Sequence, residues 1–312
     1  MIGLYVHVPF CVRKCRYCSF VSGTDLSFVS RYVDCVIREI KSYRGRANEP
    51  VDTVFFGGGT PSTLSAEQIG NILAAIKDTF AIAEDVEITC EANPESATLE
   101  WMKEIRSLGV NRLSLGVQSL SNETLRGIGR LHDADTATIA VKRAVESFPS
   151  VNVDLMVGLP TQTVEQVARD AERLLSLGIN HLSCYSLILE EGTPLFDQVQ
   201  RGLELPDEDA TVDMYDEVVE VCREHGLERY EISNFAIPGF ECKHNANCWA
   251  MHPYIGVGAA AHCFFDDRRY YNTSDVLIYM DQMDRGEDPS IPEGSNTALD
   301  RINETIMLGL RT

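Results

Sequence analysis

Short runs rich in β-branched and other apolar residues alternate with helical patterns along the first two thirds of the chain. Runs of this kind are typical of strands buried in a parallel sheet. The intervening segments repeat apolar residues at helical spacing, as Tyr32, Val36 and Ile40 do. The predicted strands cover residues 3–8, 51–56, 85–90, 112–117, 151–157 and 181–187, and the predicted helices cover residues 28–40, 69–76, 98–108, 134–145 and 163–177.

This repeated strand-then-helix order predicts a parallel sheet with right-handed crossovers that curls into most of a barrel. We therefore expect an α/β fold, a partial (six-stranded) parallel β/α barrel, over residues 1–200. After that the alternation stops. An acidic amphipathic helix within residues 204–231 is followed by a strand at 227–232, an irregular stretch rich in Gly, Cys and His, and a final helix. Residues 201–312 are expected to form a smaller C-terminal α+β region.

Glycine or polar residues follow, end or lie within every predicted strand. Active sites of β/α barrels form at the carboxyl ends of the strands, so these residues are expected to meet at one mouth. In strand order they are Cys11, Cys15 and Cys18, then Gly57 to Thr60, then Glu91, Gln118, Asp154, and Tyr185 with Ser186.

The three cysteines of "VPFCVRKCRYCSF" lie within eight positions of one another. Structural zinc usually takes four protein ligands, and no second Cys-x-x-Cys pair lies nearby. His7 and Cys35 are candidate fourth ligands, but a strand position and an apolar helix position favour packing roles for them. A 4Fe-4S cube is normally held by four thiolates, so three leave one iron open to a substrate or cofactor. A structural zinc protein is kept as a minor alternative.

The cysteine trio and its setting resemble the radical S-adenosylmethionine superfamily. The resemblance extends over nearly the whole chain to the oxygen-independent coproporphyrinogen III oxidase branch, and within it to the HemW-type haem chaperones. It is carried by the blocks "LYVHVPFCVRKCRYCSF", "FFGGGTPS", "CEANPES", "LSLGVQSL", "VDLMVGLPTQT" and "YEISNFAIPG".

The resemblance implies a role for each matching residue. Cys11, Cys15 and Cys18 would bind the 4Fe-4S cluster, whose open iron would take S-adenosylmethionine. Roles around that cofactor fall to residues of the first five strands and their loops. Tyr5 and Tyr17 would pack beside it, Gly58, Gly59 and Thr60 would pass its amino group, Glu91 and Asp154 would take hydroxyl or amino hydrogens, Gln118 would contact the ribose and Arg130 the carboxylate.

The resemblance leaves open whether the chain is a catalyst or a carrier. Coproporphyrinogen oxidases of this branch carry a further cysteine two positions after the trio, where this chain has Phe20, and an extension ahead of the first strand. Both differences make coproporphyrinogen oxidase activity unexpected here. The alternative is a catalyst that acts on a porphyrinogen or another substrate through the 5′-deoxyadenosyl radical.

A His-Asn-x-x-Tyr-Trp motif of the chaperones, associated with haem, is matched by residues 244–249. His244 and Trp249 agree with it, and Cys248 replaces the tyrosine. The resemblance therefore implies haem contact by His244, and a thiolate is itself a competent haem ligand. An unrelated metal site among Cys242, His252, His262 and Cys263 is the alternative.

Charge and hydropathy limit the partners. The formal net charge is −20, and no long run of Lys and Arg occurs, so nucleic acid is not expected as a partner. No signal peptide or 18-residue apolar run occurs, so we expect a cytoplasmic protein without stable membrane insertion. "RINETIMLGLRT" resembles the start of a further C-terminal domain, which we expect to be missing or shortened. The haem acceptor protein and the electron donor stay unidentified.

Overall fold

The six predicted strands form a parallel sheet in a computed structural model that describes residues 1–294 and 297–312. Each strand pairs in parallel with the next one along the chain, which confirms the predicted α/β order. Their bounds are β1 Ile2–Val8, β2 Val51–Gly58, β3 Ile82–Ala92, β4 Arg112–Gln118, β5 Ser150–Val157 and β6 His181–Ser186.

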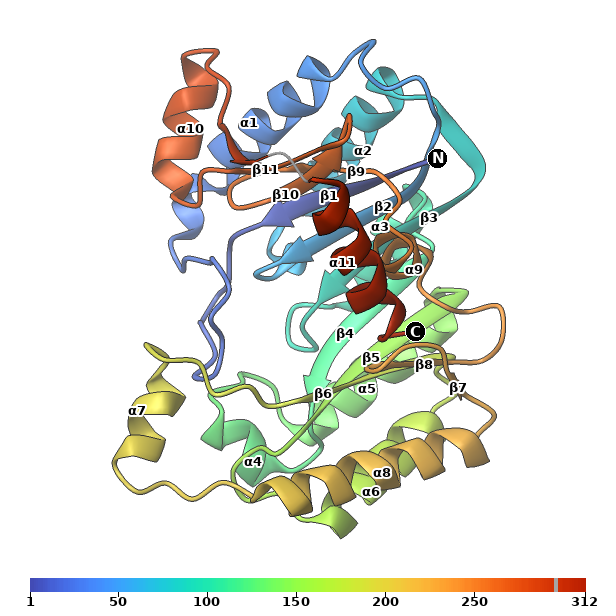
Figure 1. The fold of residues 1–312 in the computed structure, drawn as a ribbon. Coiled ribbons are helices and arrows are strands. Elements are labelled where there is room, and N and C mark those ends of the chain that lie inside the picture. The colour runs from blue at the N-terminus through green and yellow to red at the C-terminus, as the bar shows by residue number, and fades with distance from the viewer. Residues whose placement is uncertain (295–296) are drawn as a thin grey trace.

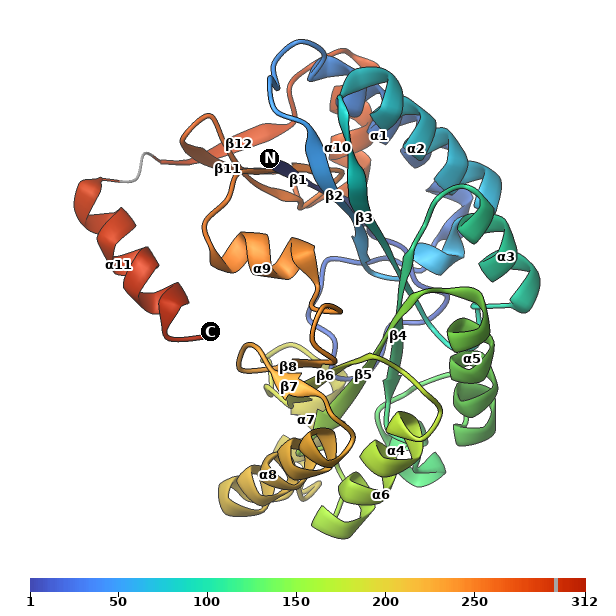
Figure 2. The same cartoon turned by 90° about the vertical axis from the view of Figure 1, so that its right-hand side faces the viewer.

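Helices cover the outer face of this curved sheet (Figures 1 and 2). The predicted ones are α1 Val29–Ser42, α2 Ala66–Thr79, α3 Leu99–Ser107, α5 Ala134–Ser147 and α6 Val164–Leu175. Ser65, Thr98, Asp133 and Thr163 each precede a helix and accept a hydrogen bond from its first turn, which explains where these helices begin. Two short helices that follow β4 and β6 were not predicted: α4 Asn122–Gly127 and α7 Pro194–Gln200.

The chain after residue 200 is more regular than predicted. The acidic helix is confirmed as α8, Glu208–Glu224, but the strand expected at residues 227–232 is reduced to β7, Glu228–Arg229, and a further strand, β8, follows at Asn234–Ala236. The prediction of an irregular stretch after this strand was wrong. The stretch contains α9 Lys243–Trp249, β9 Tyr254–Val257, β10 His262–Phe265 and β11 Arg268–Asn272, followed by α10 Val276–Asp284, β12 Ser290–Gly294 and α11 Ala298–Gly309. Strands this short are too brief for a repeat of two residues to emerge from the sequence.

These late strands extend the barrel sheet at both sides. The order is β12-β11-β10-β9-β1-β2-β3-β4-β5-β6-β8-β7, and β9 pairs in parallel with β1. The predicted domain boundary near residue 200 stays a prediction. Strands from both sides of that residue belong to one sheet. Among the described residues, no helix is both long and apolar enough to cross a bilayer.

Glu39 joins the first helix to the late strands. Its buried carboxylate, on α1, accepts hydrogen bonds from the Gly258 amide at 2.8 Å, from Asn272 Nδ2 on β11 at 2.6 Å and from the Tyr279 hydroxyl on α10 at 2.5 Å. Burial raises the pKa of Glu39. These donors satisfy an acidic group that would otherwise be costly to bury.

We expect Glu39→Ala to lower the free energy of unfolding by about 3 kcal/mol, because it leaves three buried donors without their acceptor. Urea denaturation followed by circular dichroism measures the change. Glu104→Ala, on the exposed face of α3, is the matched control and should change it by less than about 0.5 kcal/mol. Equal effects of the two substitutions would contradict the assigned role.

Candidate functional site

The cysteine trio lies in the loop that leaves the carboxyl end of β1. Backbone hydrogen bonds hold this loop: the Cys11 amide donates to the Gly23 carbonyl at 2.9 Å, and the Arg16 amide donates to the Ile128 carbonyl at 2.9 Å. Cys11 is buried, Cys15 and Cys18 are partly exposed, and all three are free thiols. The trio therefore sits on an anchored loop, and none of its sulfur atoms is in a disulfide.

Three side chains from different loops connect two of these sulfur atoms. Thr60, after β2, donates its hydroxyl to Cys11 Sγ at 3.3 Å, and Asn93, after β3, donates its Nδ2 to Thr60 Oγ1 at 3.2 Å. Arg130, after α4, then bridges Asn93 Oδ1 at 2.7 Å and Cys15 Sγ at 3.5 Å. These hydrogen bonds tie the cysteine loop to the loops that follow β2, β3 and α4.

Arg130 is a buried cation at the centre of this network. Its Nη2 also donates to the Gly116 carbonyl, and its Nε is buried without a hydrogen-bond partner among the described residues. The neighbouring Tyr17, Cys15 and Glu95 outweigh burial and raise the pKa of Arg130. Both terminal nitrogens are thus engaged within the protein, so a cofactor carboxylate held by paired donors would have to replace some of these contacts.

Tyr17 lies on the cysteine loop itself, and Tyr5 lies on the strand that precedes it. Tyr17 packs against Ile128, Met156 and Leu159, and burial raises its pKa. Tyr5, on β1, has its hydroxyl 3.0 Å from His7 Nδ1, and burial likewise raises its pKa. His7 Nε2 lies 3.2 Å from the Val21 carbonyl, so both ring nitrogens of His7 are occupied and it is not a free fourth ligand.

Gly58 and Gly59 are required by the protein itself. A Cβ on Gly58 would lie 2.6 Å from the His7 ring, and Gly58 has a φ of 112°. A Cβ on Gly59 would lie 2.8 Å from the Phe10 carbonyl oxygen and 2.9 Å from that of Val8. Packing against β1 and its loop therefore accounts for both glycines, whatever group passes them.

Glu91 and Asp154 place two carboxyl groups in the barrel interior. Burial, and then the charge of Asp154, raise the pKa of Glu91 to about 8, although the Gly58 amide donates to Glu91 Oε2 at 3.2 Å. Burial also raises the pKa of Asp154 to about 6. Near neutral pH Glu91 is therefore mostly protonated and Asp154 mostly ionised, which gives the mouth one hydroxyl donor and one anionic acceptor.

Gln118 ends β4 in an unusual backbone conformation. Its φ is 70°, and the pairing of β4 with β5 shifts register between Gly116 and Gln118. Such a bulge redirects a side chain at the end of a strand, and positive φ is uncommon in a residue other than glycine. His132 supports this bend, because its Nε2 lies 3.1 Å from the Val117 carbonyl and its Nδ1 lies 3.1 Å from Glu95 Oε2.

His244 lies nearer the amino ends of β1 and β2 than the cysteine loop does, and its ring stacks on that of Tyr5, with 6.4 Å between the ring centroids. It is on α9, on the inner side of the sheet (Figure 2), and its Nδ1 is 2.9 Å from Thr53 Oγ1, which is near the start of β2. Thr53 pairs with Gly3, whereas the cysteine loop follows Val8, a separation of about 17 Å along a strand. Burial lowers the pKa of His244 to about 4, so its ring is neutral at physiological pH.

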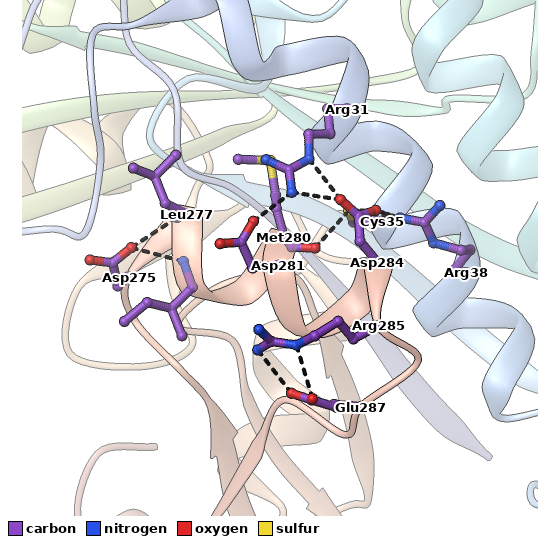
Figure 3. A network of polar contacts seen from close by, with 11 residues as sticks. Arg31, Cys35, Arg38, Asp275, Leu277, Met280, Asp281, Asp284, Arg285 and Glu287 are labelled. Carbon is purple, nitrogen blue, oxygen red and sulfur yellow. Dashed lines mark hydrogen bonds and ion pairs between the residues drawn. The ribbon is translucent and has the colours of Figure 1, made fainter.

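The structure does not join the other candidate ligands to the trio. Cys35 points from α1 toward α10, and its sulfur lies 3.8 Å from the Met280 carbonyl of α10 (Figure 3). Arg38 Nη2, also on α1, lies 3.1 Å from the same sulfur. Cys242 contacts Glu87 at 3.6 Å, and Cys263 contacts the Gly256 backbone. Within residues 1–294 and 297–312, no three His, Cys, Asp or Glu side chains converge as around a single metal ion.

The mouth residues fit an iron–sulfur cluster better than a single ion. The trio itself does not converge on one point, and a 4Fe-4S cube does not need it to, because each thiolate binds a different iron. The sulfur donors, the buried cation Arg130 and the two carboxyls of unlike protonation all lie at the carboxyl end of the sheet. Such a site can hold a cluster and a polar ligand that carries both amino and carboxylate groups.

Asn93 is the mouth residue that the sequence analysis missed. It links Thr60 to Arg130, and it is the first residue after β3, two positions beyond Glu91. The rule that polar residues after barrel strands meet at one mouth could have found it.

Comparison with protein families matches residues 5–174 to the Radical SAM superfamily. The "Heme chaperone HemW" of Lactococcus lactis is 37% identical over 98% of this chain and 80% of its own length. The protein of the same name from Bacillus subtilis is 36% identical over 100% of this chain and 83% of its own length.

Among solved structures, the coproporphyrinogen III oxidase HemN of Escherichia coli superposes with a TM-score of 0.86 at 26% identity, covering 99% of this chain and 75% of that one. HemN is itself a Radical SAM enzyme. The barrel and the late strands thus have a common counterpart in one protein.

We expect Glu91 to make the protein without its cofactor less stable as pH rises. A carboxyl with a raised pKa contributes stability that is complete below about 4.5 and is lost as pH rises through about 8. Glu91→Gln should reduce this loss by about 2 kcal/mol, after discounting for solvent screening. Urea titrations from pH 5 to 8.5 measure it, with Glu104→Gln as control. An unchanged pH dependence in Glu91→Gln would refute the assignment.

Proposed function

This chain belongs to the radical S-adenosylmethionine superfamily and, within it, to the HemW family of heme chaperones, and from that membership we propose that it binds haem and delivers it to an acceptor protein. Membership of the superfamily implies a 4Fe-4S cluster and S-adenosylmethionine. The observation that carries the proposal is similarity to HemW proteins along the whole barrel and the late strands together.

We assign the cluster to Cys11, Cys15 and Cys18, with the remaining iron open to S-adenosylmethionine. When bound, the cluster can supply one electron to the carbon–sulfur bond of that cofactor. Around it, Thr60 and Arg130 hydrogen bond two of the sulfur atoms. Glu91 offers a hydroxyl donor and Asp154 an anionic acceptor for the cofactor's polar groups, and Gln118 and Tyr17 complete the wall of the site.

We assign the haem contact to His244. Its neutral imidazole has the lone pair that an iron ligand needs, and Cys248 lies one helical turn further along α9. The imidazole is only 6% exposed and pairs with Thr53, so haem binding through this ring requires α9 to move from its place in the barrel. In this proposal haem binds nearer the amino ends of β1 and β2 than the cluster does.

A porphyrinogen oxidase is the second candidate, because the HemN structure matches 99% of this chain. Identity to the HemW relatives is higher, at 37% against 26% for HemN. Phe20, where the oxidases have a cysteine, is 65% exposed beside the trio. Anaerobic incubation with coproporphyrinogen III, dithionite and S-adenosylmethionine, followed by mass spectrometry, separates the two. Accumulation of protoporphyrinogen would establish the oxidase.

We place this function in the cytoplasm, because the three thiols that would bind the cluster must stay reduced. The haem acceptor is a protein of unidentified class.

We expect alanine substitution of Cys11, Cys15 or Cys18 to remove most of the iron and sulfide from anaerobically prepared protein. Colorimetric iron and sulfide assays give the result. Cys35→Ala is the matched control, since its thiol is also buried and free but faces α10. Loss of the cluster from Cys35→Ala would identify a fourth protein ligand and rule out an open iron.

We expect His244→Ala to weaken haem binding about tenfold, as loss of an axial ligand does. Hemin titration followed at the Soret band measures the affinity. His225→Ala, a partly exposed histidine paired with Glu172 at 2.9 Å, is the control and should bind haem as the unaltered protein does. An unchanged Soret spectrum in His244→Ala would remove the histidine from the proposal while leaving haem binding itself intact.

A further inference from the structure

Exposed cations gather on one side of the cysteine loop. Arg13, Lys14 and Arg16 come from the loop itself, and Arg126 comes from α4; we call these four side chains the basic patch. With Gly129 and the buried Arg130 they line a hollow of about 260 Å³ that contains no acidic side chain.

The fold builds the patch from two segments more than a hundred residues apart. Arg13 Nη2 donates to the Arg130 carbonyl at 2.9 Å, and Arg16 Nη1 donates to the Gly127 carbonyl at 3.1 Å. Lys14 Nζ donates to the Phe20 carbonyl at 2.9 Å. The acceptors are backbone carbonyls, so the positive charges are held in place without being neutralised.

This concentration of positive charge runs against the rest of the molecule. The chain carries 47 acidic and 27 basic residues, yet none of the four patch residues forms an ion pair within the described part of the chain. Glu123, three positions before Arg126 on α4, forms no ion pair with it there. Bringing like charges together costs free energy, which an anionic partner would recover.

Apolar side chains beside the patch point to a protein as that partner. Val12 is 56% exposed and Phe20 is 65% exposed, and both lie on the same loop as the cysteines. An exposed aromatic ring among arginines has the composition of a protein interface. A nucleic acid is disfavoured, because a long polyanion would extend beyond four cations onto a surface whose chain carries a net charge of −20.

We propose that the basic patch is the docking surface for a small acidic protein that carries a one-electron cofactor. Cys15 lies between Lys14 and Arg16, so a protein bound here has its contact surface directly beside the cluster ligands. The negative charge of the remaining surface would repel an acidic partner elsewhere, which fixes the orientation of docking. This inference rests on the 4Fe-4S cluster of the proposed function.

The transfer moves a single electron. A partner with a flavin hydroquinone would give up one electron to the cluster and one proton to water, and its flavin would be left as the neutral semiquinone. No bond to the patch residues forms or breaks. Their role is to bind and orient the partner.

The test uses the cluster-loaded protein and an acidic FMN-containing electron-transfer protein as probe. Affinity is measured with the oxidised probe by isothermal titration calorimetry, and the rate of cluster bleaching is measured with its hydroquinone in an anaerobic stopped-flow instrument. Lys14→Glu/Arg126→Glu alters the patch. Lys103→Glu/Arg143→Glu, on the exposed faces of α3 and α5, is the matched control with the same change in net charge.

We expect the patch variant to bind the probe at least about tenfold more weakly and to be reduced by it at least about tenfold more slowly at low salt. Raising the salt from 0.05 to 0.5 M should slow reduction of the unaltered protein and have less effect on the variant. Reduction by photoreduced 5-deazariboflavin, which is uncharged, should be the same in all three proteins. Lys14→Gln/Arg126→Gln should give an intermediate loss.

Equal binding and reduction in the patch and control variants would overturn the proposal. So would slower reduction of the patch variant by the uncharged reductant, since the substitutions would then act on the cluster and not on docking. Failure of the proposed function is distinguishable, because protein that holds no iron and sulfide shows no bleaching with either reductant.

Discussion

Parallel pairing of β1 to β6 is the constraint on which the site depends. Because consecutive parallel strands place their carboxyl ends at the same edge, residues as distant as Cys11, Thr60, Asn93 and Arg130 come within hydrogen-bond reach. The charge states of the side chains at the mouth then follow from their burial. Burial keeps one carboxyl of the Glu91 and Asp154 pair protonated and leaves the other charged, while a buried guanidinium faces the thiols. Sulfur donors, a cation and two unlike carboxyls are therefore products of one strand arrangement.

Much of the fold could be predicted, because apolar runs and helical spacing in the sequence indicate which segments are buried strands and which are helices. The six strands, the first helices and the meeting of polar residues at one end all follow from spacing and strand order. The cysteine trio was recognisable because three closely spaced thiols in one loop are typical of a metal or cluster site. The reason for Gly58 and Gly59 was less accessible. Both avoid collisions with His7 and Phe10 of the same chain, and only coordinates reveal those neighbours.

Features made by distant segments could not be predicted. The basic patch combines residues 13–16 with Arg126, and no window of the sequence contains both. Strand β9 has four residues in a glycine-rich stretch, too few to show a period, yet it is the neighbour of β1. The placement of His244 is of the same kind. Its motif was visible, but its distance from the cysteines depends on α9 lying inside the barrel, against Thr53 and Glu87.

The pairing of β1 with β9 has a consequence for how the polypeptide is made. Gly3 pairs with Tyr254, so on the ribosome the first strand keeps one unpaired edge until the chain has grown past residue 257. Contacts so distant in sequence close slowly, and open strand edges favour association between nascent chains. The cysteine loop follows that strand, but its hydrogen bonds are to Gly23, Thr60, Ile128, Arg130 and Leu195, all of which are made before β9. In the proposed function, the cysteine loop is therefore ready to receive iron and sulfide before β9 closes the open edge of β1.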